Sequence, residues 1–287
     1  MLIRQLIEFR HRFHPLHKLR QSRFVARRIL PLFDQPIFIN MHGVSWKVRV
    51  RRMRHMTYVV DNRAMEPGTV AIFRTVQDLH KPKVFWDIGA NVGFYSWLLM
   101  SADRDLEAVL FEPDPDNIEL VNATIARARL EKVTLVSKAA STQAGTARFV
   151  MDPESGTTSH LETGGTGVKG AVVTVETTTL DDELAHLSAP GLIKIDVEGA
   201  EDMVLAGAAR LLETVKPVII IECFDGLESV PMRQLAAAGY EFADGDDPRD
   251  PAGTTSNYLC LPPGVNFTLD DVRARFVSEY DRWVAGR

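Results

Sequence analysis

Short apolar runs alternate with longer amphipathic segments through the middle of the chain. The runs are rich in Val, Ile, Leu and Phe, whereas the segments between them place apolar residues at helical spacing. We predict strands at 84–86, 107–111, 133–136, 192–195 and 218–223, and helices at 94–100, 114–130 and 205–212. Strands that alternate with helices indicate an α/β fold, with a mostly parallel sheet covered by helices on both faces.

Further elements flank this regular region. Apolar positions recur at helical spacing from Pro67 to Leu79, which predicts a helix before the first core strand. After the core we expect an antiparallel edge pair at 240–243 and 257–261, followed by a last amphipathic helix over 269–283.

The stretch 152–170 is polar and glycine-rich and follows neither period. We interpret it as part of a long irregular insertion. It is either a substrate loop or lid beside the site, or a surface loop without such a role.

The N-terminal part differs from the rest in both charge and pattern. Residues 1–56 carry thirteen Lys and Arg against Glu8 and Asp34, a balance of +11; because the whole chain has −5, the remainder carries −16. Amphipathic helical patterns cover 2–13 and 17–30, and a hairpin follows with its turn at His42 and Gly43. We therefore divide the chain into a basic arm and hairpin, 1–56, and a larger domain, 57–287.

The basic arm has two interpretations. Residues 1–33 either make peripheral contact with an anionic membrane surface or pack on this domain or on a second subunit of an oligomer. No run of 18 apolar residues exists, no signal peptide is evident, and the only two cysteines, Cys223 and Cys260, have no metal-type neighbours. We expect a cytoplasmic protein, with the inner membrane surface as the place of any peripheral contact.

Acidic residues stand at or just after the ends of successive strands. They are Asp87, Glu112, Asp196, Glu198 and Glu222. In an open parallel sheet these ends lie side by side, and ligands bind in the crevice beyond them. The pattern therefore predicts one acidic site.

A glycine-containing loop, DIGANVG at 87–93, follows the first core strand and opens a helix. Gly89 permits a tight turn close to a ligand, Gly93 permits close helix packing, and Glu112, 23 residues after Gly89, suits the two hydroxyls of a ribose. Asp87 favours an ammonium group over a pyrophosphate, and the middle glycine of a dinucleotide loop is absent. These features favour S-adenosylmethionine over a nicotinamide cofactor.

The same motifs resemble those of the FkbM family of S-adenosylmethionine-dependent methyltransferases. The resemblance covers roughly 60–225 and rests on Glu66-Pro67, DIGANVG, FEPDP at 111–115 and above all LIKIDVEGAE at 192–201. It implies a Rossmann-like class I methyltransferase fold, preceded here by the N-terminal helical and hairpin extension. It also implies O-methylation of a hydroxyl on a sugar, glycolipid or polyketide-like acceptor, and a lipid-linked or otherwise anionic sugar fits the basic arm.

The motif positions imply a cofactor site. Its residues are Glu66, Asp87, Gly89, Ala90, Asn91, Gly93, Glu112, Pro113, Ala139 and Asp196. Lys138 and Ala140, on either side of Ala139, are expected beside the adenine.

Methyl transfer to a hydroxyl needs a group that accepts the proton. Asp196 is the first candidate for this catalytic base, followed by Glu198, Glu222 and His160. An internal Lys194–Asp196 ion pair is the structural alternative for Asp196. Three strand-end carboxylates also suit Mg²⁺, but they lack a fixed ligand spacing and we assign no metal site.

Two other function classes stay open on the sequence alone. One is a nicotinamide-dependent oxidoreductase of Rossmann type, and the other is a non-catalytic protein that binds a membrane surface through its arm. The acidic body argues against a nucleic acid partner.

Overall fold

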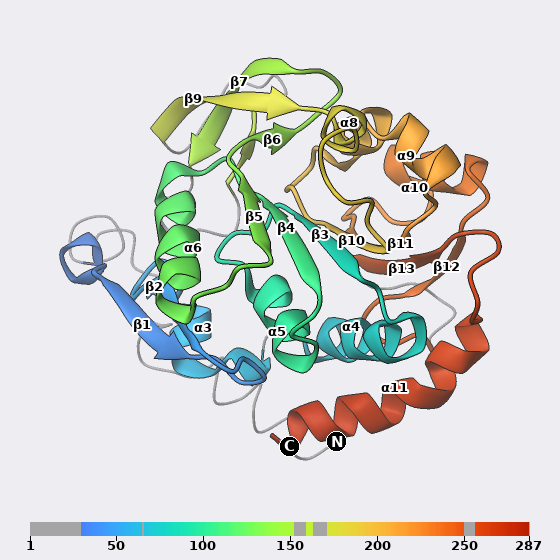
Figure 1. Cartoon of the computed structure of the whole chain (residues 1–287), viewed down its shortest axis with the longest axis horizontal. Helices are drawn as coiled ribbons and strands as arrows, with labels where there is room; N and C mark the ends of the chain where they lie inside the picture. The colour runs from blue at the N-terminus through green and yellow to red at the C-terminus, as the bar shows by residue number, and fades with distance from the viewer. Residues whose placement is uncertain (1–29, 65, 152–158, 163–170, 250–255, 287) are drawn as a thin grey trace.

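The computed structural model describes residues 30–64, 66–151, 159–162, 171–249 and 256–286. A seven-stranded sheet forms its centre, in the order β12-β13-β11-β10-β3-β4-β5 (Figure 1). β11, β10, β3, β4 and β5 are parallel, whereas β13 is antiparallel to both of its neighbours. The strands are β3 (Val84–Ile88), β4 (Glu107–Phe111), β5 (Val133–Val136), β10 (Leu192–Ile195), β11 (Val218–Glu222), β12 (Glu241–Asp244) and β13 (Asn257–Leu261). The predicted α/β fold and edge pair are confirmed.

Helices cover both faces of this sheet because its strands are apolar on both sides. In β3, Phe85 packs into one core cluster and Trp86 into the other, and both are fully buried. The first cluster includes residues of α4 (Pro67–His80), α5 (Phe94–Ala102), α6 (Pro115–Ala128) and α11 (Leu269–Val284). The second includes residues of α7 (Leu180–Glu183), α8 (Glu201–Ala206), α9 (Ala209–Thr214) and α10 (Val230–Ala237).

The predicted hairpin is present and belongs to the main core. β1 (Pro36–Asn40) pairs antiparallel with β2 (Lys47–Arg51), and the short helix α3 (Met56–Asp61) follows. Val48 and Val50 are fully buried in the cluster that includes α4 and α5. The amphipathic patterns at 2–13 and 17–30 lie outside the described residues, apart from residue 30, so membrane contact stays a prediction. Within the described part of the chain, no helix is long and apolar enough to cross a membrane.

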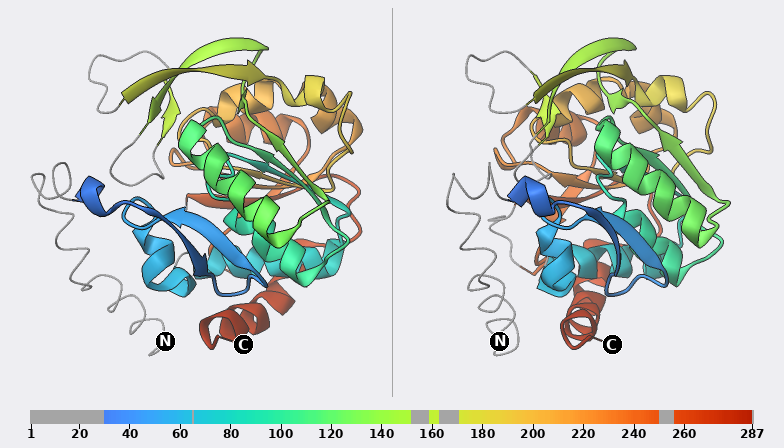
Figure 2. Two further views of the ribbon diagram at one scale, coloured as in Figure 1. Left: turned by 60° about the vertical axis from the view of Figure 1, so that its left-hand side comes forward. Right: turned by 90° about the vertical axis from the view of Figure 1, so that its left-hand side faces the viewer.

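A second sheet replaces much of the irregular stretch that we expected between the third and fourth core strands. Its order is β6-β9-β7-β8, and β7 and β9 pair over seven residues each. The strands are β6 (Ala139–Ala140), β7 (Gly145–Met151), β8 (His160–Leu161) and β9 (Ala171–Thr178). Figures 1 and 2 show this sheet on the side of the molecule opposite α11. Residues 152–158 and 163–170 lie outside the described part, so the lid hypothesis stays a prediction.

The single helix expected over 205–212 is wrong, because α8 and α9 divide at Gly207. The Gly207 backbone lies so close to the second sheet that a Cβ atom there would come within 2.1 Å of the Ser141 carbonyl oxygen. The close approach brings the connection between α8 and α9 against the end of β6.

Trp283, near the end of α11, ties this helix to the hairpin. Its indole is fully buried, donates a hydrogen bond to the Arg63 carbonyl at 3.2 Å, and lies with its ring centroid 4.5 Å from that of His42. We expect Trp283→Ala to lower the free energy of unfolding by about 3–5 kcal/mol. Chemical denaturation measures this loss, and Val277→Ala, at a 41% exposed position of the same helix, is the control with a change below about 0.5 kcal/mol. Equal losses would show that α11 does not contribute to the core in this way.

Candidate active site

A cavity of about 360 Å³ lies at the carboxyl ends of β3, β4, β10 and β11. The loops that follow β3, β4 and β10 contribute part of its wall, and Glu222 at the end of β11 adds to it. Residues of several other elements also line it, among them Tyr58 of α3, Phe94 of α5 and Leu161 of β8. This is the crevice in which ligands of open parallel sheets bind.

The loop after β3 is held tightly against its neighbours. The N–H groups of Gly89 and Ala90 both donate to the Phe111 carbonyl at 3.0 Å. Gly89 has φ +81°, and a Cβ atom there would lie 1.9 Å from the Asp196 carbonyl oxygen. Only glycine allows this approach, which brings the loop beside the end of β10.

Glu112 lies between this loop and the start of α6. Its carboxylate accepts hydrogen bonds from the backbone N–H groups of Asn91, at 2.6 Å, and Asp114, at 2.8 Å. Burial raises the pKa of Glu112 to about 8, although these two N–H groups favour the charged form. The side chain lines the cavity, so the oxygens of its carboxyl group can also accept hydrogen bonds from hydroxyl groups of a ligand.

Three further carboxyl groups gather at the ends of β10 and β11. One oxygen atom each from Asp196, Glu198 and Glu222 lies within 4.8 Å of the others. Lys194 donates to Asp196 at 2.6 Å and lies 5.2 Å from the centre of the Tyr95 ring. The structure therefore contains the predicted Lys194–Asp196 ion pair at the wall of the cavity.

The three carboxyl groups differ in their affinity for protons. Burial opposes ionisation of Asp196, but Lys194 and a hydrogen bond from Glu222 outweigh it and lower the pKa of Asp196. Burial and the Asp196 charge raise the pKa of Glu222 to about 9 and that of Glu198 to about 7. At neutral pH the Asp196–Glu222 pair therefore carries one proton, on the Glu222 side.

Most of the predicted cofactor residues line this cavity. They are Glu66, Gly89, Ala90, Asn91, Glu112, Pro113, Ala139 and Asp196, together with Lys138 and Ala140. Asp87 and Gly93 lie behind the loop instead. Asp87 is 1% exposed and accepts a hydrogen bond from the Ser96 hydroxyl at 2.7 Å, and Gly93 lies against the Trp97 ring.

The structure does not bring all four candidate bases to the cavity. Asp196, Glu198 and Glu222 line the cavity, whereas His160 does not. His160 lies on β8 opposite Val150, between Ser159 and Leu161, which both line the cavity. Since neighbouring strand residues face opposite sides, β8 directs these two and not His160 toward the site.

Two tyrosines form a part of the site that sequence reasoning missed. The Tyr95 hydroxyl donates to Glu66 at 2.6 Å, and Tyr58 lines the cavity beside it. Tyr95 comes two residues after Gly93, where the apolar helix pattern suggested only a core residue.

The backbone of several cavity residues is left-handed. Glu66 adopts φ +37°, and Asn91 and Glu198 also have positive φ values, of +54° and +56°. Among the described residues, three of the six non-glycine residues with positive φ therefore line the cavity.

Comparison with known proteins assigns this arrangement to a family. The sequence profile of the methyltransferase FkbM domain matches residues 87–242, more than half of the chain. The chain belongs to the FkbM methyltransferase family. A hexuronic acid methyltransferase, AglP of Haloferax volcanii, is 23% identical over 202 residues, which are 70% of this chain and 79% of that protein.

Solved structures with a related fold show lower identity. An FkbM methyltransferase from Methylobacillus flagellatus KT is 16% identical with a TM-score of 0.41, and the match covers 62% of this chain and 43% of that chain. A putative transferase from Pyrococcus horikoshii, PH0793, is 11% identical with a TM-score of 0.44, over 80% of this chain and 72% of that one.

S-adenosylmethionine is the cofactor of this methyltransferase, and the cavity fits it. Gly89 keeps the loop free of a side chain where it turns against β10, and Glu112 presents a carboxylate suited to ribose hydroxyls. The family assignment also decides against the nicotinamide-dependent oxidoreductase.

Because Glu222 holds a proton at neutral pH, we can predict how the stability of the protein depends on pH. A carboxyl group whose pKa rises on folding binds more protons in the folded state, so its contribution to stability falls as the pH rises from about 4.5 to about 9. Glu222→Gln removes this titration. We therefore expect the melting temperature of the variant, relative to that of the wild type, to increase from pH 5 to pH 9. Glu241→Gln, at an exposed position of β12, is the control. A difference that does not change with pH would contradict the assignment.

Proposed function

We propose that this methyltransferase transfers a methyl group to a hydroxyl of a sugar or a similar polyol. The observation that carries the proposal is the group of carboxylates from Asp196, Glu198 and Glu222 beside the cofactor residues in one cavity. Such a group can bind several hydroxyls and accept a proton from one of them. The relative that acts on hexuronic acid supports a sugar-like acceptor.

When bound, S-adenosylmethionine supplies an electrophilic methyl group on a sulfonium. The chain has to align the acceptor hydroxyl with it and remove the hydroxyl proton. We assign the proton-accepting role to Glu198. Asp196 already accepts hydrogen bonds from Lys194 and Glu222, and Glu222 also accepts one from Ser256 at 3.2 Å. Among the described residues, Glu198 has no hydrogen-bond partner for its carboxylate.

The proton affinity of Glu198 supports the same role. Burial and the Asp196 charge bring its pKa to about 7, and a base works best when its pKa lies near the working pH. Asp196, whose pKa is lowered, is a weaker base, and Glu222 holds a proton at neutral pH. Glu198 thus takes the role of base that we expected for Asp196, and the Asp196–Glu222 pair binds acceptor hydroxyls.

The charge of the cavity favours an acceptor that is not anionic near its reacting hydroxyl. Among the described residues, the cations that line the cavity are Lys138 and Lys194, and each is paired with a carboxylate, of Glu183 and Asp196 respectively. Glu198 adds a negative charge when it is deprotonated as the proposed base. An acceptor carboxylate or phosphate placed beside it meets like charge, which costs several kcal/mol. A neutral polyol avoids this cost.

The role of Glu198 is tested by Glu198→Gln, which keeps the shape of the side chain but removes the base. We expect kcat to fall by about 10²–10⁴ while the affinity for S-adenosylhomocysteine stays at the wild-type value. In the wild type, kcat should rise with pH through about 7, because deprotonation of Glu198 creates the active form. Glu228→Gln, at an exposed position after β11, is the control. Unchanged kcat, or activity that disappears on removal of Mg²⁺ with EDTA, would contradict this role.

The acceptor class is tested with matched sugars. A neutral alkyl hexoside and the corresponding hexuronate, each with labelled S-adenosylmethionine, differ only in the carboxylate. We expect methylation of the neutral compound at about tenfold or higher kcat/KM. Preference for the hexuronate would overturn the charge argument. If S-adenosylhomocysteine does not bind and no hydroxyl compound is methylated, the proposed function is wrong.

A further inference from the structure

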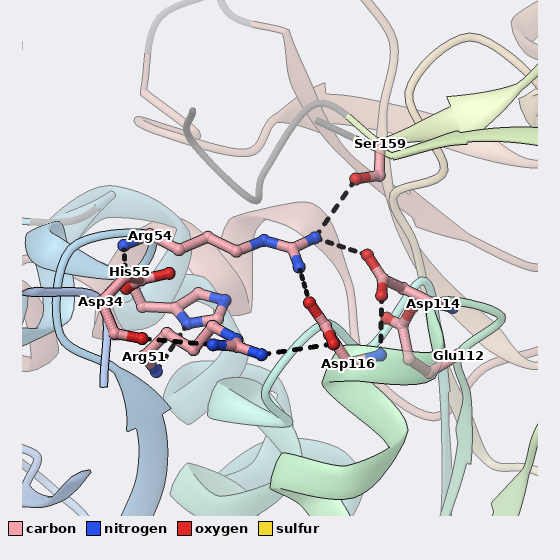
Figure 3. A network of polar contacts seen from close by, with 8 residues as sticks. All are labelled: Asp34, Arg51, Arg54, His55, Glu112, Asp114, Asp116 and Ser159. Carbon is pink, nitrogen blue, oxygen red and sulfur yellow. Dashed lines mark hydrogen bonds and ion pairs between the residues drawn. The ribbon is translucent and has the colours of Figure 1, made fainter. Parts of the chain in front are cut away.

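Arg54, which lies outside the region 87–242 that matches the family, extends its side chain to the edge of the cofactor site. Arg54 follows β2 and is 4% exposed, and it lies before the matched residues 87–242. Its backbone N–H and that of Met53 donate to the Asp34 carboxylate at 2.9 and 2.8 Å. These contacts fix the start of the side chain, which extends toward the N-terminus of α6 (Figure 3).

The Arg54 guanidinium contacts three groups there. Nη2 pairs with the carboxylate of Asp114, a side chain with no exposed surface, and lies 3.5 Å from the Ser159 hydroxyl. Nη1 donates to Asp116 at 3.2 Å. Arginine suits this place because its planar, forked guanidinium directs donors to several acceptors at once. Without Arg54, the Asp114 carboxylate would be buried with no positive partner among the described residues.

Asp114 connects this pair to Glu112. One Asp114 oxygen caps α6 by accepting the Asp116 N–H at 2.9 Å, and the other pairs with Arg54. The Asp114 N–H donates to one Glu112 oxygen, while the Asn91 N–H holds the other. The position of the Asp114 side chain therefore controls one of the two backbone donors that orient the Glu112 carboxylate. Arg54 also offsets the repulsion between the two neighbouring carboxylates.

We propose that Arg54 is a positioning residue of the cofactor site. By holding Asp114, it keeps the Glu112 carboxylate aligned for the ribose hydroxyls of S-adenosylmethionine. This inference rests on the proposed role of Glu112 and extends the cofactor site to the N-terminal hairpin. Arg54 is not among the residues that line the cavity, so its effect on binding passes through Asp114 and Glu112.

The test is calorimetric binding of S-adenosylhomocysteine and of its 2′-deoxyribose analogue to Arg54→Met, Arg54→Lys and the wild type. We expect Arg54→Met to weaken S-adenosylhomocysteine binding about 10- to 100-fold, the usual effect of losing a group that holds a binding residue in place. The loss should be smaller for the deoxy analogue, so the preference for the ribose hydroxyl falls. Arg54→Lys keeps the positive charge but lacks the forked guanidinium, and its loss of affinity for S-adenosylhomocysteine should be intermediate.

Two variants separate positioning from a general effect on folding. Arg51→Met is the matched control, because Arg51 contacts Asp116 at 3.3 Å and is not paired with Asp114; it should bind like the wild type. Arg54→Met combined with Asp114→Asn removes the unpaired charge and retains a good helix cap, so it should recover part of the lost affinity. If Arg54→Met does not fold, the double variant and Arg54→Lys are compared with the wild type in its place.

The outcomes distinguish this inference from the proposed function. If neither the wild type nor any variant binds S-adenosylhomocysteine, the cofactor site itself is wrong. If the wild type binds, Glu112→Ala does not, and the folded Arg54 variants bind both ligands like the wild type, only the role of Arg54 is overturned. An Arg54 defect that is equal for both ligands and is not relieved by Asp114→Asn would also overturn it.

Discussion

The close approach of the Gly89 loop to the end of β10 is the contact on which the site depends. β3 and β10 are neighbours in the sheet, and Gly89 allows their loops to touch through backbone atoms. The Glu112 side of the cavity, where we propose that the ribose binds, and the Asp196 side therefore share one wall. A side chain at this position would separate the two loops, and with them the cofactor residues from the groups to which we assign acceptor binding.

Buried charge is the second constraint, and the molecule meets it in two places by similar means. At the end of β10, Lys194 lies among carboxylates and outweighs the cost of its own burial by pairing with Asp196. At the start of α6, Arg54 does the same for Asp114. In both cases a cation supplied from within the fold makes the burial of several acids tolerable. Part of the +11 balance of residues 1–56 is thus used internally, by Arg51 and Arg54, and is not available to an outside partner.

The sequence predicted the central sheet because its strands are buried on both faces and read as continuous apolar runs, as in Val218–Glu222. It did not predict the second sheet, although β9 is rich in valine and threonine, because β9 buries only some of its residues and directly follows the polar stretch 152–170. The division at Gly207 depends on Ser141, 66 positions earlier, and a local period contains no information about that contact. The candidate site was predicted for the same reason as the sheet, since strand order places acids at one edge. The partners of Asp87 and of Arg54 are tertiary contacts and became visible only in the structure.

The order of the central sheet has a consequence for how the protein acquires its structure during translation. β13 lies between β11 and β12, and α11 then packs across the helices beneath β3 and β4. A nascent chain that has emerged only as far as β12 lacks the strand that joins it to the rest. The edge of β11 is then open, and the apolar face under α11 is uncovered. Such an intermediate exposes unpaired backbone and apolar surface together, the combination that chaperones bind. The edge of β11 closes when β13 emerges, and the apolar face is covered only when α11 follows it.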